Sequence, residues 1–255
     1  MRRTVKVALL GLALILATSI RAMAQAPQTP PEKPTPALPS VDQVLDKYVQ
    51  SLGGKAAIEK LTSRVSKGTF EADQGVSGEI EFYSKAPNKT ALVVDLSGLG
   101  QVRQGFDGTV GWAHNPQMGV REMSGQELSV TKRGAQFHQA LKLRELYPKM
   151  AVQGKQKVGA RETYLIEADP GDGSLRRMYF DAATGLMVRN EIERDTPQGR
   201  GTYETELDDY KEVDGVKLPF TVRQSNPGVS FTIKVTEVQH NVPIEDAKFA
   251  KPATQ

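Results

Sequence analysis

Few side chains of this sequence are placed where they could do chemistry. The three histidines, His114, His138 and His240, are far apart and lack the short spacing of metal ligands, so surface or boundary positions explain them best. The sequence has no cysteine, serine-hydrolase elbow, phosphate-binding glycine loop, zinc-protease motif or dinucleotide fingerprint. We therefore expect no catalytic residue, no metal and no cofactor, and we expect that the protein is not an enzyme.

The charged clusters are better explained as solvated strand faces than as sites. Glu204, Glu206, Asp208 and Asp209 are interleaved with apolar residues, which predicts the outer face of a strand rather than a cation site. The pair Arg176-Arg177 is predicted to be charge at a strand edge and not an anion clamp. Trp112, the only tryptophan, has two explanations: ordinary core packing, or the wall of a ligand pocket, which suits a large amphipathic ring.

The elements that position these residues are mostly strands. Residues 157–194 predict three antiparallel strands, because apolar and polar residues alternate between two Asp- and Gly-containing turns. In the third strand, Leu186, Val188 and Ile192 fall on one face and Met187 on the other. The same alternation predicts further strands at 64–72, 78–84, 100–106, 110–113, 203–210, 216–224 and 229–238. Residues 90–96 are apolar on both faces and predict a strand with cover on each side, which gives about ten strands in all. Residues 243–255 are predicted to be a turn followed by a loose end.

Helices are predicted in two regions. Ser40 is a helix cap, followed by an apolar stripe over 41–52 and a short second helix at 55–61. Residues 124–147 give a looser stripe, which Gly134 splits and Pro148 ends. A long antiparallel sheet curls, so the predicted fold class is mainly β with α: a curved sheet forming an open half-barrel, with helices covering its concave side.

The N-terminus predicts export. Residues 1–24 have a basic start, an apolar run and a small-x-small cleavage site, which together indicate a signal peptide cut near Ala24. Residues 25–39 are a proline-rich disordered linker, and 40–255 form the domain. The signal carries four basic residues and no acidic one, so the 33 Lys plus Arg against 30 Asp plus Glu become 29 against 30. This balance argues against nucleic-acid binding, and we expect a periplasmic monomer.

The half-barrel geometry predicts a ligand pocket. Two short helical segments are too small to cover the apolar face of about ten strands, so an apolar hollow should remain. Such a hollow can hold an acyl chain, because each buried methylene contributes about 0.8 kcal/mol. The predicted pocket residues are Phe82, Val94, Trp112, Met178, Phe180, Phe220, Phe231 and Ile233.

Three short motifs resemble those of a known family. The stretch 106–116, FDGTVGWAHNP, resembles the D-G-x-x-x-W-x-x-N-P motif of the periplasmic lipoprotein carriers, the LolA/LolB-like superfamily. Lys85-Ala86-Pro87-Asn88 is similar to the turn that precedes this motif, and Asp246-Ala247-Lys248-Phe249 with Pro252 is similar to the closing segment. The resemblance covers residues 41–252.

The resemblance implies a half-barrel with a helical lid that carries lipoprotein acyl chains to the outer membrane. In the soluble carriers an arginine that helps to hold the lid closed precedes the turn proline; here that position is Ala86, and the basic residue is Lys85. The membrane-anchored branch requires an N-terminal cysteine, which is absent. The resemblance therefore implies a soluble carrier of lipid or lipoprotein. An envelope membrane protein is the expected partner that loads the carrier or receives its cargo.

A second hypothesis is a non-carrier module of the envelope, in which the helices fill the hollow and the rim binds a protein partner. The state of the cavity distinguishes the two hypotheses. An enzyme is the third and weakest, because no acid, base and nucleophile come together in the sequence.

Overall fold

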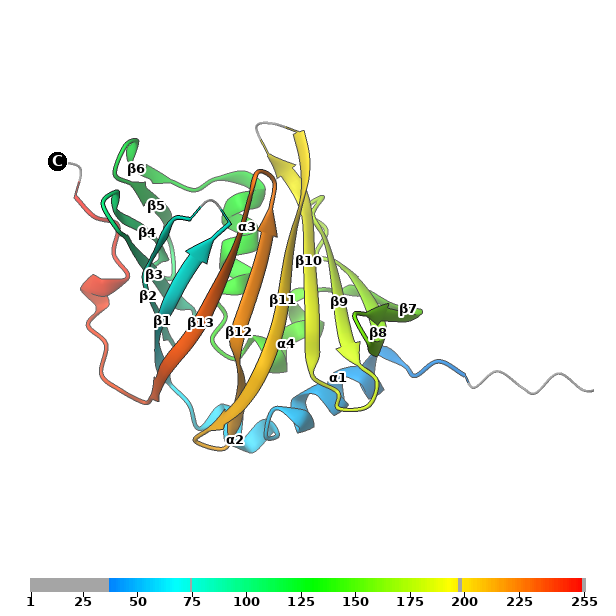
Figure 1. The fold of residues 1–255 in the computed structure, drawn as a ribbon. Coiled ribbons are helices and arrows are strands. Elements are labelled where there is room, and N and C mark those ends of the chain that lie inside the picture. The colour runs from blue at the N-terminus through cyan, green and yellow to red at the C-terminus, as the bar shows by residue number, and fades with distance from the viewer. Residues whose placement is uncertain (1–36, 74, 197–198, 254–255) are drawn as a thin grey trace, which may run out of the picture. The chain divides into compact units, whose positions relative to one another are not determined.

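The strands of the described residues all belong to one antiparallel sheet with the order β6-β5-β4-β3-β2-β1-β13-β12-β11-β10-β9-β8-β7. The structure is a computed structural model that describes residues 37–73, 75–196 and 199–253. One meander runs from β1 out to β6, a second runs from β7 to β13, and the two meet where β1 pairs with β13 (Figure 1). The strands are β1 (Ser63–Ala72), β2 (Ser77–Lys85), β3 (Lys89–Leu96), β4 (Gly100–Phe106), β5 (Gly111–Asn115), β6 (Gly119–Glu122), β7 (Lys149–Val158), β8 (Arg161–Asp169), β9 (Leu175–Asp181), β10 (Met187–Thr196), β11 (Gly199–Val213), β12 (Val216–Asn226) and β13 (Val229–His240).

The sheet is curved and its two edge strands, β6 and β7, do not pair with each other, so the predicted open half-barrel is confirmed. The expected number of about ten strands was too low, because the described residues form 13. Both edge strands were missing from the prediction: β6 has four residues with one apolar side chain, and β7 carries three lysines. Lysine is common at sheet edges, where it discourages pairing with another chain, and it weakens the alternation that predicts a strand.

Four α-helices lie on one side of the sheet or at its end (Figure 1). They are α1 (Val41–Ser51), α2 (Lys55–Glu59), α3 (Gly125–Gly134) and α4 (Gln139–Leu146), and a short 3₁₀ helix, η1 (Asp246–Lys248), follows the last strand. α1 begins as predicted: Ser40 Oγ accepts from the amide of Gln43 at 3.2 Å, and the amide of Ser40 donates to Gln43 Oε1 at 2.8 Å. The predicted helical region 124–147 is divided into α3 and α4 next to Gly134, as expected.

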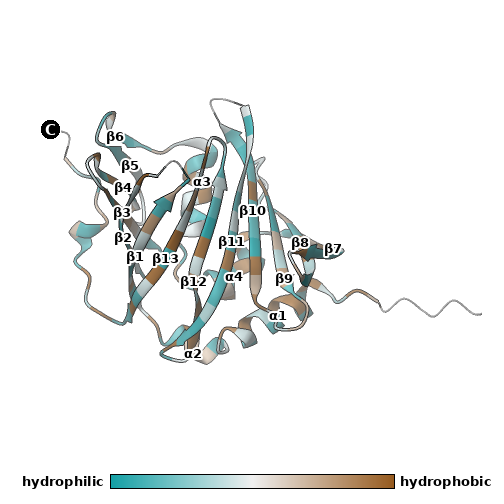
Figure 2. Ribbon diagram, in the orientation of Figure 1, coloured by the Kyte–Doolittle hydropathy of each residue, from teal (hydrophilic) through white to brown (hydrophobic). Residues whose placement is uncertain are grey.

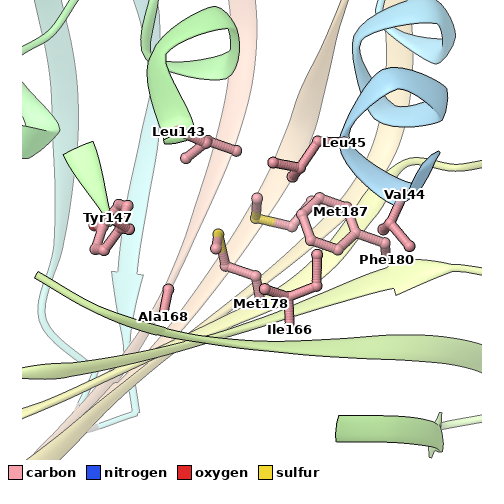
Figure 3. Close-up of a cluster of buried hydrophobic side chains, with 9 residues drawn as sticks. All are labelled: Val44, Leu45, Leu143, Tyr147, Ile166, Ala168, Met178, Phe180 and Met187. Carbon is pink, nitrogen blue, oxygen red and sulfur yellow. The ribbon is translucent and has the colours of Figure 1, made fainter. Parts of the chain in front are cut away.

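The helices pack against one face of the sheet, which we call the inner face. Apolar and polar residues alternate along the strands (Figure 2). On the inner face of β8, β9 and β10, strand side chains meet those of α1 and α4, and the shared core contains Val44, Leu45, Leu143, Tyr147, Ile166, Ala168, Met178, Phe180 and Met187 (Figure 3). This core fixes α1 and α4 over one half of the sheet.

The opposite, outer face is covered over β1, β2 and β3 by residues 241–253, which we call the C-terminal segment. Ile244 and Phe249 of this segment pack against Tyr83 and Ala91. In Figure 1 the segment runs outside the sheet on the side of β2 and β3. Both faces of this half of the sheet therefore carry apolar side chains, as predicted for the strand at 90–96.

A β-bulge in β10 reverses the predicted orientation of its residues. The register with β9 shifts between Met187 and Arg189, which leaves Val188 without a partner in that ladder. Met187 consequently joins the inner core, whereas Val188 joins a small outer cluster with Leu165 and Tyr179. The expectation that Leu186, Val188 and Ile192 share one face was wrong, because strict alternation assumes a continuous ladder.

The predicted signal peptide 1–24 and most of the predicted linker 25–39 lie outside the described residues. The chain divides into the units Met1–Ala37 and Leu38–Gln255, and the second unit contains every helix and strand named above. Within the described ranges, no helix is both long and apolar enough to cross a membrane.

Candidate ligand-binding cavity

An apolar cavity lies on the inner face of β1, β2, β3, β12 and β13. Its volume is about 280 Å³, near the lower end of the ~300–1,000 Å³ typical of small-molecule sites. Phe82 and Ile233, both predicted pocket residues, lie in its wall. The lining is Arg64, Ser66, Lys67, Ile80, Phe82, Leu92, Leu218, Pro219, Val222, Ile233, Val235 and Val238.

The hollow continues beneath the helices. A second cavity of about 250 Å³ shares Arg64, Leu218 and Pro219 with the first, and its other walls include side chains of α1, α2 and α4. A third cavity of about 220 Å³ shares Gly134 and Gln139 with the second. The inner side of the sheet therefore holds a row of adjoining spaces, with the most apolar one under β1 and β13.

A bulge widens the wall of the first cavity. The register between β1 and β13 shifts between Lys67 and Gly68, so Val235 and Val238 both face inward although they are three residues apart. Gly68 lies where a Cβ would be 2.2 Å from the carbonyl oxygen of Lys234, so no other residue fits there without moving the backbone.

Met178 and Phe180 are in the filled half of the hollow. Their exposed fractions are 0% and 1%, and α1 and α4 cover both side chains (Figure 3). The Tyr48 ring contacts the Phe180 ring at a centroid distance of 5.1 Å. The structure thus separates these two residues from Phe82 and Ile233: the first pair packs in a core, the second pair lines a cavity.

The remaining predicted inner residues lie near the cavity without lining it. Val94 pairs with Ile80, a lining residue, and is buried. Phe231 is two residues from Ile233 along β13, and its ring lies 4.9 Å from that of Phe70. Phe220 is partly buried, and its ring lies 4.6 Å from Lys211 Nζ.

Trp112 faces away from the cavity. It pairs with Gly105, which pairs with Ala91, and Ala91 belongs to the outer cluster under the C-terminal segment. The indole is fully buried, and its Nε1 donates to the carbonyl oxygen of Phe249 at 2.8 Å. Gly105 is required opposite the ring, since a Cβ there would be 2.7 Å from it. Of the two explanations for Trp112, core packing describes its position.

The motifs that carry the family resemblance meet at this outer cluster. Lys85 Nζ and Lys89 Nζ donate to the two carboxylate oxygens of Asp246 at 2.9 and 2.8 Å. Hydrogen bonds from these two lysines lower the pKa of Asp246 to about 2. Lys85 lies one residue before Ala86, the position of the arginine in the soluble carriers. It contacts the C-terminal segment by donating to Asp246 and to the carbonyl oxygen of Ile244. The motifs stabilise the sheet and its outer cover.

Two arginines of the inner face were not predicted as functional residues. Arg176 was predicted to lie at a strand edge, but β9 is inside the sheet and Arg176 is only 8% exposed, donating to Asn190 and to the Tyr147 hydroxyl. The sequence signal is that Arg176 shares its face with Met178 and Phe180 in the strand alternation. Arg64 lines the first two cavities, and nothing in the sequence of β1 distinguishes it from an exposed strand residue.

The acidic cluster forms ion pairs. Arg189 pairs with Glu204 at 3.4 Å and Glu206 at 2.6 Å, and Arg161 pairs with Asp208 at 2.9 Å. No group of three or more metal-ligating side chains occurs within residues 37–73, 75–196 and 199–253.

His138 and His240 each contact a different partner. His138 contacts the carbonyl of Leu61 at 2.9 Å, and His240 contacts Asp214 at 2.9 Å. The His240 side chain is only 1% exposed, which is more buried than the predicted boundary position.

Three solved structures share this architecture. A LolA superfamily protein from Nitrosomonas europaea covers 84% of this chain and 99% of its own, with a TM-score of 0.53 and 12% identity. A putative outer membrane lipoprotein-sorting protein domain from Vibrio parahaemolyticus covers 82% and 96%, with a TM-score of 0.53 and 13% identity. A DUF1329 family protein from Desulfovibrio piger covers 82% and 97%, with a TM-score of 0.51 and 18% identity.

No protein-family model and no curated protein matches the sequence. At these identities the solved structures establish the fold alone. The fold is LolA-like, as the three motifs predicted, and its class is the open half-barrel.

Proposed function

We propose that the protein is a periplasmic binder or carrier of a hydrophobic ligand with an acyl chain, and that the ligand occupies the cavity under β1 and β13. The observation that carries the proposal is the apolar wall of this cavity, formed by nine apolar side chains among the described residues that line it. The likeness to a lipoprotein-sorting domain supports the same class of ligand. The predicted signal peptide supports the periplasm, and the sorting of lipids or lipoproteins to the outer membrane is the process we propose.

The energetic argument favours binding over catalysis. An acyl chain gains about 0.8 kcal/mol for each methylene that it buries, so it needs few polar contacts. On the inner face of β8, β9 and β10, α1 and α4 fill the space around Met178 and Phe180, and the cavities that remain beneath the helices have more polar walls. The ligand therefore occupies the half of the inner face next to the β1–β13 pairing.

The test is a steric block inside the cavity. Val235 lines the cavity on β13, and Val235→Trp would place an indole in the volume proposed for the ligand. We expect saturable binding of the neutral fluorescent probe N-phenylnaphthylamine to the wild-type protein, and at least about tenfold weaker binding to the variant.

The matched control is Val229→Trp, which makes the same substitution at the start of β13. Val229 is 40% exposed and is not among the described lining residues. The Val229→Trp variant should bind the probe as tightly as the wild-type protein. Absence of saturable probe binding to the wild-type protein would refute the proposal, and so would equal loss in the two variants. If only Val235→Trp loses probe binding, native mass spectrometry of protein purified from its own envelope would identify the lipid carried.

One observation favours a second function. Because α1 and α4 already fill half of the hollow, the protein could act as an envelope module that binds a protein partner through its rim. In that case Val235→Trp would leave partner binding and cellular function intact, whereas a carrier would lose its function.

A further inference from the structure

The cavity contains a positive charge without a counter-charge. Among the described residues, the Arg64 side chain makes no hydrogen bond and no ion pair, and its Nε is buried without a partner. The guanidinium carries five donors: Nε is fully buried, whereas the residue as a whole is only partly buried, so its other donors are open to the cavity that it lines. Arg64 therefore differs from Arg176, whose donors are bonded to Asn190 and Tyr147.

Arg64 stands at the junction of the two cavities. It lines both the apolar space under β1 and β13 and the space beneath the helices. No aspartate or glutamate occurs among the described lining residues of either space. Two lysines are also among the lining residues, but Lys67 pairs with Glu81 at 3.9 Å and Lys217 is exposed. The positive charge at the junction is therefore that of Arg64.

The neighbours of Arg64 do not neutralise it. Across the strand pairing, Arg64 lies opposite His240 on β13 and Ser84 on β2. His240 gives its Nδ1 to Asp214 at 2.9 Å, and its Nε2 is buried without a partner. Burial lowers the pKa of the Arg64 guanidinium, and the nearby Tyr48 hydroxyl opposes this shift only in part. Arg64 Nε and its cross-strand neighbour His240 Nε2 are thus both buried without a partner, and of these two residues only Arg64 carries a permanent charge.

We propose that Arg64 binds the anionic head group, a carboxylate or a phosphate, of an alkyl-chain ligand whose tail lies in the apolar cavity. The inference rests on the proposed function and specifies the ligand class. In this arrangement the guanidinium pairs with two oxygens of the head group, which is the geometry that arginine provides for both oxyanions. The tail extends from Arg64 past Ile233 towards Phe231 and Phe70.

The test compares ligands of equal chain length. Dodecanoate, dodecyl phosphate, dodecanol and dodecyltrimethylammonium would each displace N-phenylnaphthylamine from the wild-type protein, below their micelle concentrations. We expect one or both anions to bind at least about tenfold more tightly than dodecanol, which corresponds to ~1.4 kcal/mol. The cation should bind most weakly. The tighter anion identifies the head group as a carboxylate or a phosphate.

Variants then assign the preference to Arg64. Arg64→Met should reduce the preference for the anions to about onefold while dodecanol binding is kept, and Arg64→Lys should retain part of it. Arg223→Met is the matched control, because Arg223 is 52% exposed on β12 and lies outside the lining. It should keep the wild-type preference. A thermal melt of each variant shows whether it is folded, and the wild-type comparison needs no variant.

The outcomes separate the two proposals. Dodecanol binding as tightly as the anions to the wild-type protein would overturn the assignment of an anionic ligand and leave the lipid-binding function standing. An anion preference that persists in Arg64→Met would overturn the role of Arg64. Failure of both the probe and dodecanol to bind would overturn the function itself.

Discussion

At the scale of single residues, position on a strand decides between packing and binding. Phe82 on β2 and Trp112 on β5 are both large aromatic residues of the same half of the sheet, yet one lines the cavity and the other is buried under the C-terminal segment. The difference is the parity of each residue in the cross-strand register. The sequence shows parity within one strand, but it does not show which face of β5 corresponds to which face of β2. The register that relates them runs through β3 and β4.

The indole of Trp112 gives a prediction at this scale. Trp112→Phe keeps an aromatic ring but leaves the carbonyl oxygen of Phe249 without its donor, which should cost about 1–3 kcal/mol of unfolding free energy. Urea denaturation would measure the loss. Binding of N-phenylnaphthylamine should be unchanged, because the ring lies on the outer face. A large loss of probe affinity in a fully folded variant would contradict this placement.

At the scale of elements, the sequence predicts those with strong alternation and misses those without it. The strands from β8 to β13 were predicted because each has a regular apolar face. The edge strands β6 and β7 were missed, since exposed edges need fewer apolar residues. The C-terminal segment was predicted as a loose end, although Phe249 is fully buried and Asp246 pairs with two lysines. Its anchors come from β2 and β3, about 160 residues earlier, a distance that local patterns do not reveal.

The ion pairs of Asp246 predict how the C-terminal segment responds to pH. The pKa of Asp246 is about 2 in the folded chain, below its ordinary value of 3.8. The carboxylate therefore contributes stability above pH 3.8, and this contribution is lost as the pH falls from about 4 to about 2. The protection of residues 244–250 against hydrogen exchange, relative to the intrinsic exchange rate at each pH, should fall over that interval. Added salt should weaken the effect, because Asp246 is exposed.

The control for this pH response is Asp246→Asn, in which residues 244–250 should exchange faster at neutral pH and respond less to acid. Asp195→Asn removes an exposed carboxylate that pairs with Arg200 far from the segment, and it should leave the exchange of 244–250 unchanged. If Asp246→Asn keeps the wild-type acid response, the two lysine pairs do not hold the segment.

At the scale of the whole domain, Leu38–Gln255, the three motifs predicted the fold but not the ligand site. They converge on the outer face, around Trp112 and Asp246, where they stabilise the sheet. The cavity is formed by residues of β1, β2, β3, β12 and β13 that no motif contains. This separation explains why a resemblance carried by these motifs indicates the architecture and leaves the chemistry of the ligand to residues such as Arg64.

The path of the chain gives a prediction for the whole domain. After β6, at one edge of the sheet, the chain crosses to β7 at the other edge through α3 and α4. α4 buries Leu143, whereas α3 contains no buried residue. We expect backbone amides of α3 to exchange faster than those of α4, because few packed side chains resist local opening. Equal protection of the two helices, measured by hydrogen exchange with mass spectrometry, would contradict this expectation.

The same crossing limits how the two edges of the sheet can move. Residues 123–148 join β6 to β7 and therefore connect the two edges of the curved sheet. A bulkier ligand that flattens the sheet would move these edges apart, and α3, which contains no buried residue, would unfold first. The length of this connection would then limit the size of the ligand, while the hydrogen bonds between the strands stay intact.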